Sequence, residues 1–174
     1  MVRNILVAWM VMLMPALVLA QSVAVDSKQP IEISADTLEV FQNDQKAIFS
    51  GNVIARQGNI NMKSSRMQVY YKGGGDDVQG AMKGISKIVA DGGVFFAAPR
   101  ETARGGQAVY DVDRQMVTMA GDVVLTRDKN VLKGTQLVYN LATGKSVLSA
   151  ASTQQNNGGR VKGIFVPSQK GSAR

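Results

Sequence analysis

The sequence contains neither cysteine nor histidine, and each absence excludes a class of chemistry. Without cysteine there are no disulfide bonds, no thiolate catalysis and no cysteine-ligated zinc site. Without histidine the chain lacks the commonest general base and metal ligand. No Gly-x-Ser-x-Gly elbow occurs, and Gly144-Lys-Ser resembles a phosphate-binding loop only in part, since Tyr139 stands where that loop needs a glycine. The sequence therefore predicts a protein that is not an enzyme and has no metal site or cofactor.

Aromatic residues are also scarce, with five Phe, four Tyr and one Trp in 174 residues. The basic residues are not interleaved with aromatics, as stacking on single-stranded nucleic acid requires, so we expect no nucleic-acid partner. A sugar-binding platform usually exposes several aromatics. The scarcity of aromatics therefore disfavours the alternative of a carbohydrate-binding or structural β-protein.

The first 20 residues have the pattern of an export signal. Arg3 supplies the positive start, Ile5–Leu19 is apolar, and Ala20 is a small residue suited to cleavage. The apolar stretch of about 15 residues is short for a spanning helix, which needs roughly 20. We predict a signal peptide over residues 1–20, with Ala24 as a second cleavage site. An uncleaved membrane anchor is the alternative.

The remaining chain is long enough for one domain, which we place at residues 21–168, followed by a short basic tail at 169–174. Residues 129–174 hold seven basic residues and no acidic one, whereas residues 21–128 hold 12 basic and 13 acidic residues. A basic end in an exported protein indicates an anionic partner, such as phosphorylated lipid, a membrane surface or an acidic protein. A solvated tail is the alternative.

One short phrase occurs three times, at 47–54, 88–95 and 117–124. Each copy reads apolar-x-apolar-x-Gly-x-Val, which places the apolar side chains on one face of a strand. Similar alternating segments recur about every ten residues between turn residues, and no later segment keeps helical periodicity over 12 residues. We also predict a bulge near Ala35–Asp36, a loop or irregular edge over 98–106 and a final strand within 160–166. The fold class is therefore all-β, forming a wall or groove rather than a catalytic pocket.

Three segments together resemble the OstA-like family of periplasmic lipopolysaccharide transport proteins: Gln29–Leu38, Phe49–Ile54 and Gly159–Ser168. The resemblance implies a twisted, slightly open β-jellyroll of mostly antiparallel strands, with an apolar groove between two sheets. It also implies a non-catalytic periplasmic bridge that binds the lipid A acyl chains of lipopolysaccharide in that groove. Such a bridge passes lipopolysaccharide from the inner-membrane to the outer-membrane assembly complex. The membrane-tethered component of the same pathway is the alternative within the family.

The resemblance further implies where partners bind. An inner-membrane tethered OstA-like partner is expected at the N-terminal edge around Ile31–Val40. The periplasmic domain of an outer-membrane translocon is expected at the C-terminal edge around Val147–Val166. Because strand addition satisfies unpaired edge groups, self-association is expected to be head-to-tail and open-ended.

Two arguments predict which residues line the groove. Matching positions in the family imply contacts with lipid for Ile31, Phe95, Tyr110 and Val112. The apolar face of the repeated phrase adds Phe49, Val53 and Met119, although packing of an ordinary core is the alternative for every one of these residues. The alternation of side chains places Val94 and Phe96 inward and leaves Phe95 outward, unless a bulge at Gly92–Gly93 changes the phase.

Overall fold

The structure is a computed structural model that describes residues 29–72, 84–150 and 159–167. Within these ranges every regular element is a β-strand, which confirms the all-β prediction. None of the described residues forms a helix that could cross a membrane. The predicted signal peptide and the basic tail at 169–174 lie outside the described residues, so the predicted domain bounds stay predictions.

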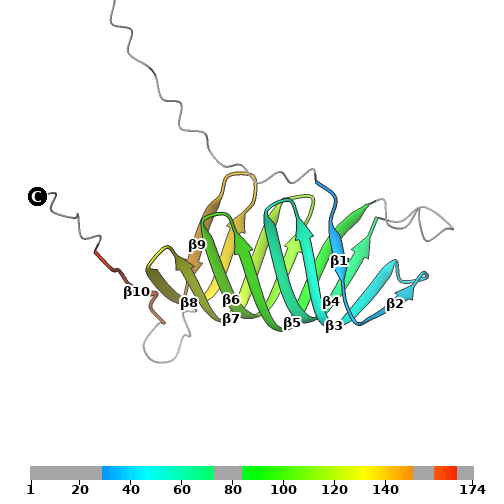
Figure 1. Cartoon of the computed structure of the whole chain (residues 1–174), viewed down its shortest axis with the longest axis horizontal. Coiled ribbons are helices and arrows are strands. Elements are labelled where there is room, and N and C mark those ends of the chain that lie inside the picture. Colours follow the sequence, from blue (N-terminus) through cyan, green and yellow to red (C-terminus); the bar gives the residue numbers. More distant parts are fainter. Residues whose placement is uncertain (1–28, 73–83, 151–158, 168–174) are drawn as a thin grey trace, which may run out of the picture.

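The strands form one antiparallel sheet in which chain neighbours are mostly sheet neighbours (Figure 1). Their bounds are β1 Glu32–Ser34, β2 Thr37–Phe41, β3 Lys46–Gln57, β4 Ile60–Tyr71, β5 Ile85–Ala98, β6 Glu101–Asp111, β7 Met116–Arg127, β8 Asn130–Asn140, β9 Lys145–Ser149 and β10 Lys162–Ile164. The path runs β1-β3-β4-β5-β6-β7-β8-β10, with β2 beside β3 and β9 beside β8. The final strand agrees with the prediction. The segment 98–106, predicted as a loop or irregular edge, instead contains the first six residues of β6, which pairs with β5 on one side and β7 on the other.

The glycine in each copy of the repeated phrase makes a corner in its strand. Gly51 and Asn52 both have positive φ, of 80° and 47°, and the matching pairs in β5 and β7 do the same. Glycine adopts this backbone conformation at little cost, and Asn or Asp tolerates it better than most residues. The ladder between β3 and β4 loses register between Ser50 and Val53, as at a β-bulge. The phrase therefore encodes a bent strand.

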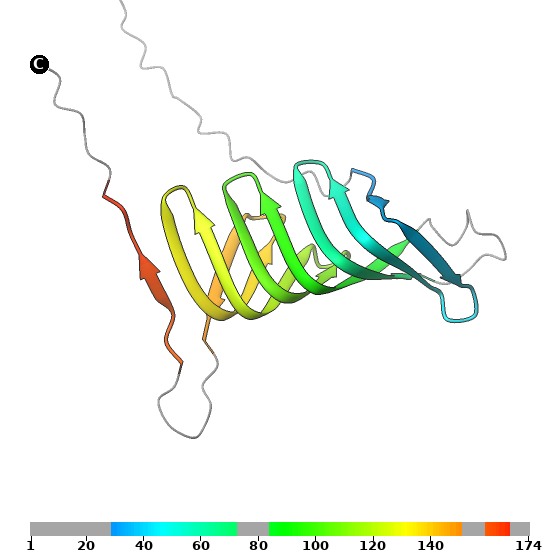
Figure 2. The same ribbon diagram turned by 60° about the horizontal axis from the view of Figure 1, so that its bottom comes forward.

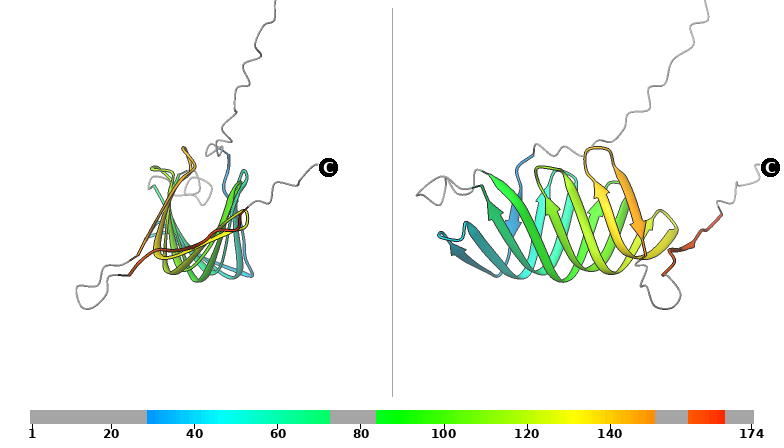
Figure 3. Two further views of the ribbon diagram at one scale, coloured as in Figure 1. Left: turned by 90° about the vertical axis from the view of Figure 1, so that its left-hand side faces the viewer. Right: turned by 180° about the vertical axis from the view of Figure 1, so that it is seen from behind.

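The corners line up across the sheet, because every ladder from β3 to β8 shifts register near its middle. They fold the single sheet into a V-shaped trough, seen end-on in Figure 3 (left). We call its two sides the β1 wall and the β2 wall. The β1 wall contains β1, β10, the second halves of β3, β5 and β7, and the first halves of β4, β6 and β8. The β2 wall contains β2, β9 and the complementary halves.

The predicted pair of sheets thus consists of two halves of one continuous sheet. The corners close the bottom of the trough. The strand-connecting turns border its open side, which we call the mouth: 57–60, 98–101 and 127–130 on the β1 wall, and 111–116 and 140–145 on the β2 wall. Strands β1 and β2 lie at one end of the trough, and β9 and β10 at the other (Figures 1 and 2).

At Ala35–Asp36, where a bulge was predicted, the chain leaves one wall for the other. Strand β1 pairs with the second half of β3, and β2 pairs with the first half. The Asp36 N–H donates to the Gly51 carbonyl at 3.0 Å, and the Asn52 amide donates to the Asp36 carboxylate at 2.9 Å. The predicted bulge is therefore a break between two strands, β1 and β2.

The inward sides of both walls pack against each other. Phe96 of the β1 wall and Tyr139 of the β2 wall bring their ring centroids to 5.3 Å. Met67 and Met119 are fully buried among these side chains. Both methionines therefore belong to the core that joins the two walls.

Candidate functional site: the apolar interior and its mouth

The interior of the trough narrows to a small apolar cavity near the N-terminal end. Residues of both walls line it, and they include Ile31, Ala55, Ile60, Met62, Ile88, Tyr110 and Val117. The cavity has a volume of about 20 Å³, which is enough for roughly one water molecule. The two walls thus pack closely against each other in this part of the interior. A hydrocarbon chain enters this part of the interior only if the walls move apart.

Six of the seven predicted groove residues face this interior. Phe49, Val53, Tyr110 and Met119 are buried in the core, and Ile31 and Val112 are partly buried against it. Only Ile31 and Tyr110 line the cavity itself. Contact with lipid stays a prediction for all six.

Phe95, the seventh predicted groove residue, does not face the interior. Its neighbours Val94 and Phe96 are buried in the interior, whereas Phe95 is half-buried on the outer face of the β1 wall. There the Arg104 guanidinium lies over its ring, 5.4 Å from the centroid. A register shift does occur between Asp91 and Val94, but it leaves the inward phase of Val94 and Phe96 intact. The assignment from side-chain alternation is therefore confirmed.

A hydrogen bond joins the two walls at the mouth near the N-terminal end. The Tyr110 hydroxyl of the β2 wall donates to the side-chain carbonyl of Gln57, on the β1 wall, at 2.7 Å. The Gln57 amide in turn donates to the Gln29 carbonyl at 3.0 Å. Burial raises the pKa of Tyr110, the bond to Gln57 lowers it, and the Asp111 charge raises it, with a net upward shift. The phenol therefore stays protonated and able to donate at neutral pH.

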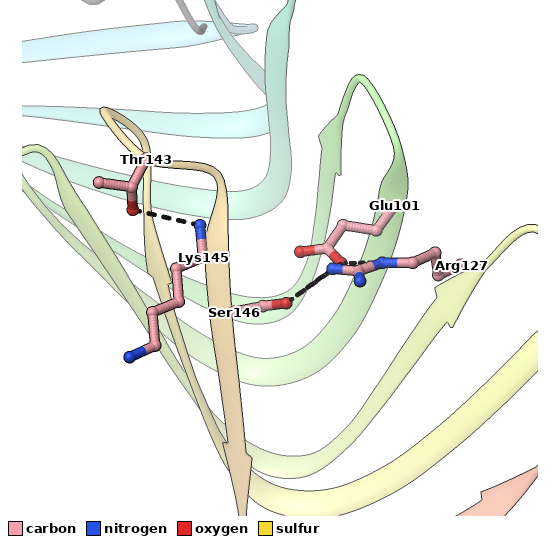
Figure 4. Close-up of polar contacts among 5 residues, drawn as sticks. All are labelled: Glu101, Arg127, Thr143, Lys145 and Ser146. Atoms are coloured by element: carbon pink, nitrogen blue, oxygen red, sulfur yellow. Dashed lines mark hydrogen bonds and ion pairs between the residues drawn. The ribbon is translucent and has the colours of Figure 1, made fainter. Parts of the chain in front are cut away.

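A second polar cluster joins the walls nearer the C-terminal end (Figure 4). Arg127 donates from Nε and Nη2 to one oxygen of Glu101, at 3.0 and 2.5 Å, within the β1 wall. The same Nη2 donates to the hydroxyl of Ser146, on the β2 wall, at 3.0 Å. Ser146 also donates to that Glu101 oxygen at 3.3 Å. This cluster links the two walls through a buried carboxylate.

Glu101 is only 4% exposed, and its other oxygen, Oε1, has no hydrogen-bond partner among the described residues. Burial raises the pKa of nearby Tyr139, and the Glu101 charge raises it further, while Arg127 and Arg100 lower it. Sequence reasoning missed this cluster. Pro99 and Arg100 gave the segment the composition of a loop, so the inward phase of Glu101 with Ala103 was not apparent.

Both ends of the trough carry exposed apolar side chains on or directly beside edge strands. Of the nine large hydrophobic residues that are exposed among the described residues, eight lie at these ends: Leu38, Val40, Phe41, Val147, Val161, Ile164, Phe165 and Val166. The edges of a sheet also present unpaired N–H and C=O groups. Each end is therefore suited to pairing with a further strand.

Together the fold and the site define a binding protein: a trough with an apolar interior, a polar mouth and two free edges. Comparison with known proteins agrees with a binding or transport role. The family model described as "LptA/(LptD N-terminal domain) LPS transport protein" matches residues 32–145. A protein of Rhizobium meliloti (strain 1021) with no assigned function is 34% identical over 143 residues, which cover 82% of this chain and 74% of that protein.

The lipopolysaccharide export system protein LptA of Escherichia coli (strain K12) is 26% identical over 157 residues, covering 90% of this chain and 82% of that protein. The crystal structure of LptH, the LptA-homologous periplasmic component of the lipopolysaccharide transport device of Pseudomonas aeruginosa, has the same fold. Its TM-score is 0.66 at 19% identity, covering 82% of this chain and 99% of that one.

The chain therefore belongs to the LptA/LptD N-terminal domain family. It is a member of a family of lipopolysaccharide transport proteins, a non-catalytic role, as the sequence predicts.

Proposed function

We propose that this protein is a periplasmic bridge that holds the acyl chains of lipopolysaccharide between its two walls. It passes the lipid along the trough from an inner-membrane complex to an outer-membrane complex. The observation that carries this proposal is an apolar interior that runs between two free edges of the same sheet. A chain of such troughs would offer one continuous apolar path.

Acyl chains supply the free energy that opens the walls. Each methylene moved from water into an apolar environment contributes about 0.8 kcal/mol. The interior side chains exchange contacts with the opposite wall for contacts with the lipid, so little apolar surface meets water. The sugars and phosphates remain outside the apolar interior, because burying polar or charged groups without partners is costly.

The two ends take different partners. Strands β1 and β2 accept the membrane-tethered partner, and β9 and β10 accept the outer-membrane domain. Copies of this chain join head-to-tail by the same strand additions, with exposed apolar residues such as Val40 and Ile164 covered at each junction.

Depletion in cells tests the function directly. Lipopolysaccharide should accumulate at the inner membrane when the protein is lost, and normal delivery to the outer membrane would contradict the proposal. In vitro, the protein should bind lipid A but not the delipidated oligosaccharide, and the reverse preference would favour a carbohydrate-binding protein. The intact mass of the exported protein separates a bridge from a tethered component, because only the latter keeps residues 1–20.

A further inference from the structure

We propose that a cavity at the mouth binds a hydroxyl-bearing saccharide, the head of a lipid whose acyl chains lie in the interior. This inference rests on the proposed function, and it assigns the head group to a particular set of side chains. The cavity lies where the turn 98–101, the end of β7 and the β8–β9 hairpin meet. Glu101, on the β1 wall, is one of its lining residues (Figure 4).

Both walls build this cavity. Its lining includes Arg100, Glu101 and Arg127 from the β1 wall, and Tyr139 and Thr143 from the β2 wall. The cavity has a volume of about 140 Å³, compared with about 20 Å³ for the apolar cavity in the interior. A ligand group of more than one or two atoms therefore fits here without the walls first moving apart.

The unpaired oxygen of Glu101 is the specific signal. Glu101 Oε2 accepts hydrogen bonds from Arg127 and Ser146, while the buried Oε1 accepts none from the described residues. Figure 4 shows this second oxygen pointing away from Arg127, toward the β8–β9 hairpin. Buried acceptors are nearly always paired in folded proteins, because an unpaired one is costly. The site therefore lacks one hydrogen-bond donor.

The chemistry of the lining selects the kind of donor. Phosphate accepts hydrogen bonds and repels a carboxylate, so it does not satisfy Glu101 Oε1. An ammonium group donates, but the neighbouring Arg100 and Arg127 guanidinium groups repel it. A sugar hydroxyl donates to the carboxylate and accepts from arginine, serine or threonine in the same position.

Tyr139 connects this site to the interior. Its ring packs against the fully buried Phe96, and its hydroxyl lies 3.9 Å from where a Cβ on Gly144 would be, beside the cavity. One side chain thus spans the boundary between the apolar interior and the polar mouth. An amphiphile with chains below and a saccharide above would follow the same boundary.

The test compares two probes on the exported chain: lipid A, which has a saccharide head, and a fluorescent long-chain fatty acid, which has none. Glu101→Gln keeps the shape of the side chain but replaces one carboxylate oxygen with an amide donor. We expect its affinity for lipid A to fall about tenfold or more, as for loss of a charged hydrogen bond. Its affinity for the fatty acid should change less than about twofold, because that ligand makes no such bond.

Asp128→Asn is the matched control, since it removes one negative charge from the neighbouring exposed turn, and Asn tolerates the positive φ of 55° there. It should leave both affinities unchanged. Tyr139→Phe is a second variant in case Glu101→Gln does not fold. It keeps the ring contact with Phe96 and should weaken binding of lipid A alone.

Each other outcome overturns the inference. Unchanged binding of lipid A by Glu101→Gln, or by Tyr139→Phe if the former does not fold, means that the cavity holds water only. Equal losses for both probes mean that the cluster acts only by holding the walls together. If the wild-type protein binds neither probe, the proposed function fails first.

Discussion

Tyr110 and Gln57 lie 53 positions apart in the chain and on opposite walls, yet they share a hydrogen bond of 2.7 Å at the mouth. Ser146 and Arg127 repeat this relationship nearer the other end, at 3.0 Å. These two polar links bridge the walls above the apolar interior. A lipid that enters through the mouth has to separate these groups.

Tyr110→Phe should loosen the mouth. Losing one buried hydrogen bond reduces the free energy of unfolding by about 0.5–1.5 kcal/mol. Because the link no longer has to break, a fluorescent fatty acid should also enter faster. Urea unfolding and stopped-flow fluorescence measure the two effects.

Tyr70→Phe is the control for this change. The Tyr70 hydroxyl donates to Gln68 at 3.3 Å on the outer face, so its loss should not alter the entry rate. If both variants accelerate entry equally, the Tyr110 link does not control the mouth.

Val112→Asp should abolish binding of lipid. Val112 packs against the interior beside the mouth, so the new carboxylate would lie among hydrocarbon. That costs several kcal/mol unless the group takes up a proton. Asp111→Asn, on the outer face, should have little effect, because the asparagine side-chain oxygen can still accept the Arg114 N–H at 2.9 Å. Binding assays with lipid A compare the two variants.

Photo-crosslinking checks the same assignment without a change of charge. A crosslinker at Tyr110 should label lipopolysaccharide, whereas one at Asp111 should not. Equal labelling at both positions would place the lipid somewhere other than the interior.

Lysine at either edge should cap the assembly. Val40→Lys on β2 and Ile164→Lys on β10 each put a charge on an exposed edge strand, which opposes strand addition. Each variant alone should be monomeric at concentrations where the wild type forms chains. A mixture of the two should form dimers, because each retains one intact edge and head-to-tail contact joins different surfaces. Analytical ultracentrifugation measures all three states.

Val109→Lys provides the control for this experiment, since Val109 is exposed in the middle of the sheet rather than at an edge. It should assemble as the wild type does. A mixture of the two edge variants that stays monomeric would contradict the head-to-tail arrangement.

The strands themselves were predictable from the sequence, because alternation of apolar and polar residues depends only on neighbours in the chain. The folding of the single sheet into two walls was not predictable in this way. The phrase containing Gly51 indicates one face of one strand, and only the register between strands reveals that its corner aligns with those of β5 and β7. For the same reason alternation placed Phe95 correctly, and positional matching to the family did not.

The contacts at the mouth were harder to predict from the sequence than the strands were. Gln57 and Tyr110 look like ordinary strand residues, and their contact depends on how closely the two walls approach. Glu101 follows Pro99 and Arg100, which are typical of a loop, so nothing local indicates a buried carboxylate. Contacts between the walls arise from tertiary packing, and one sequence carries little signal for them.

Two glycines at the corners of the strands allow the cost of a steric clash to be measured separately from the cost of backbone strain. A Cβ at Gly51 would lie 2.3 Å from the Asp36 carboxylate, whereas one at Gly93 meets nothing within 4 Å. Both residues have φ near +80°, so alanine is strained by about 1–2 kcal/mol at either position. Gly93→Ala should cost only that strain. Gly51→Ala should cost clearly more, because it also displaces Asp36 from its bonds to Gly51 and Asn52. Urea unfolding at neutral pH compares the two, and equal losses would mean that the Asp36 contact adds nothing to the corner.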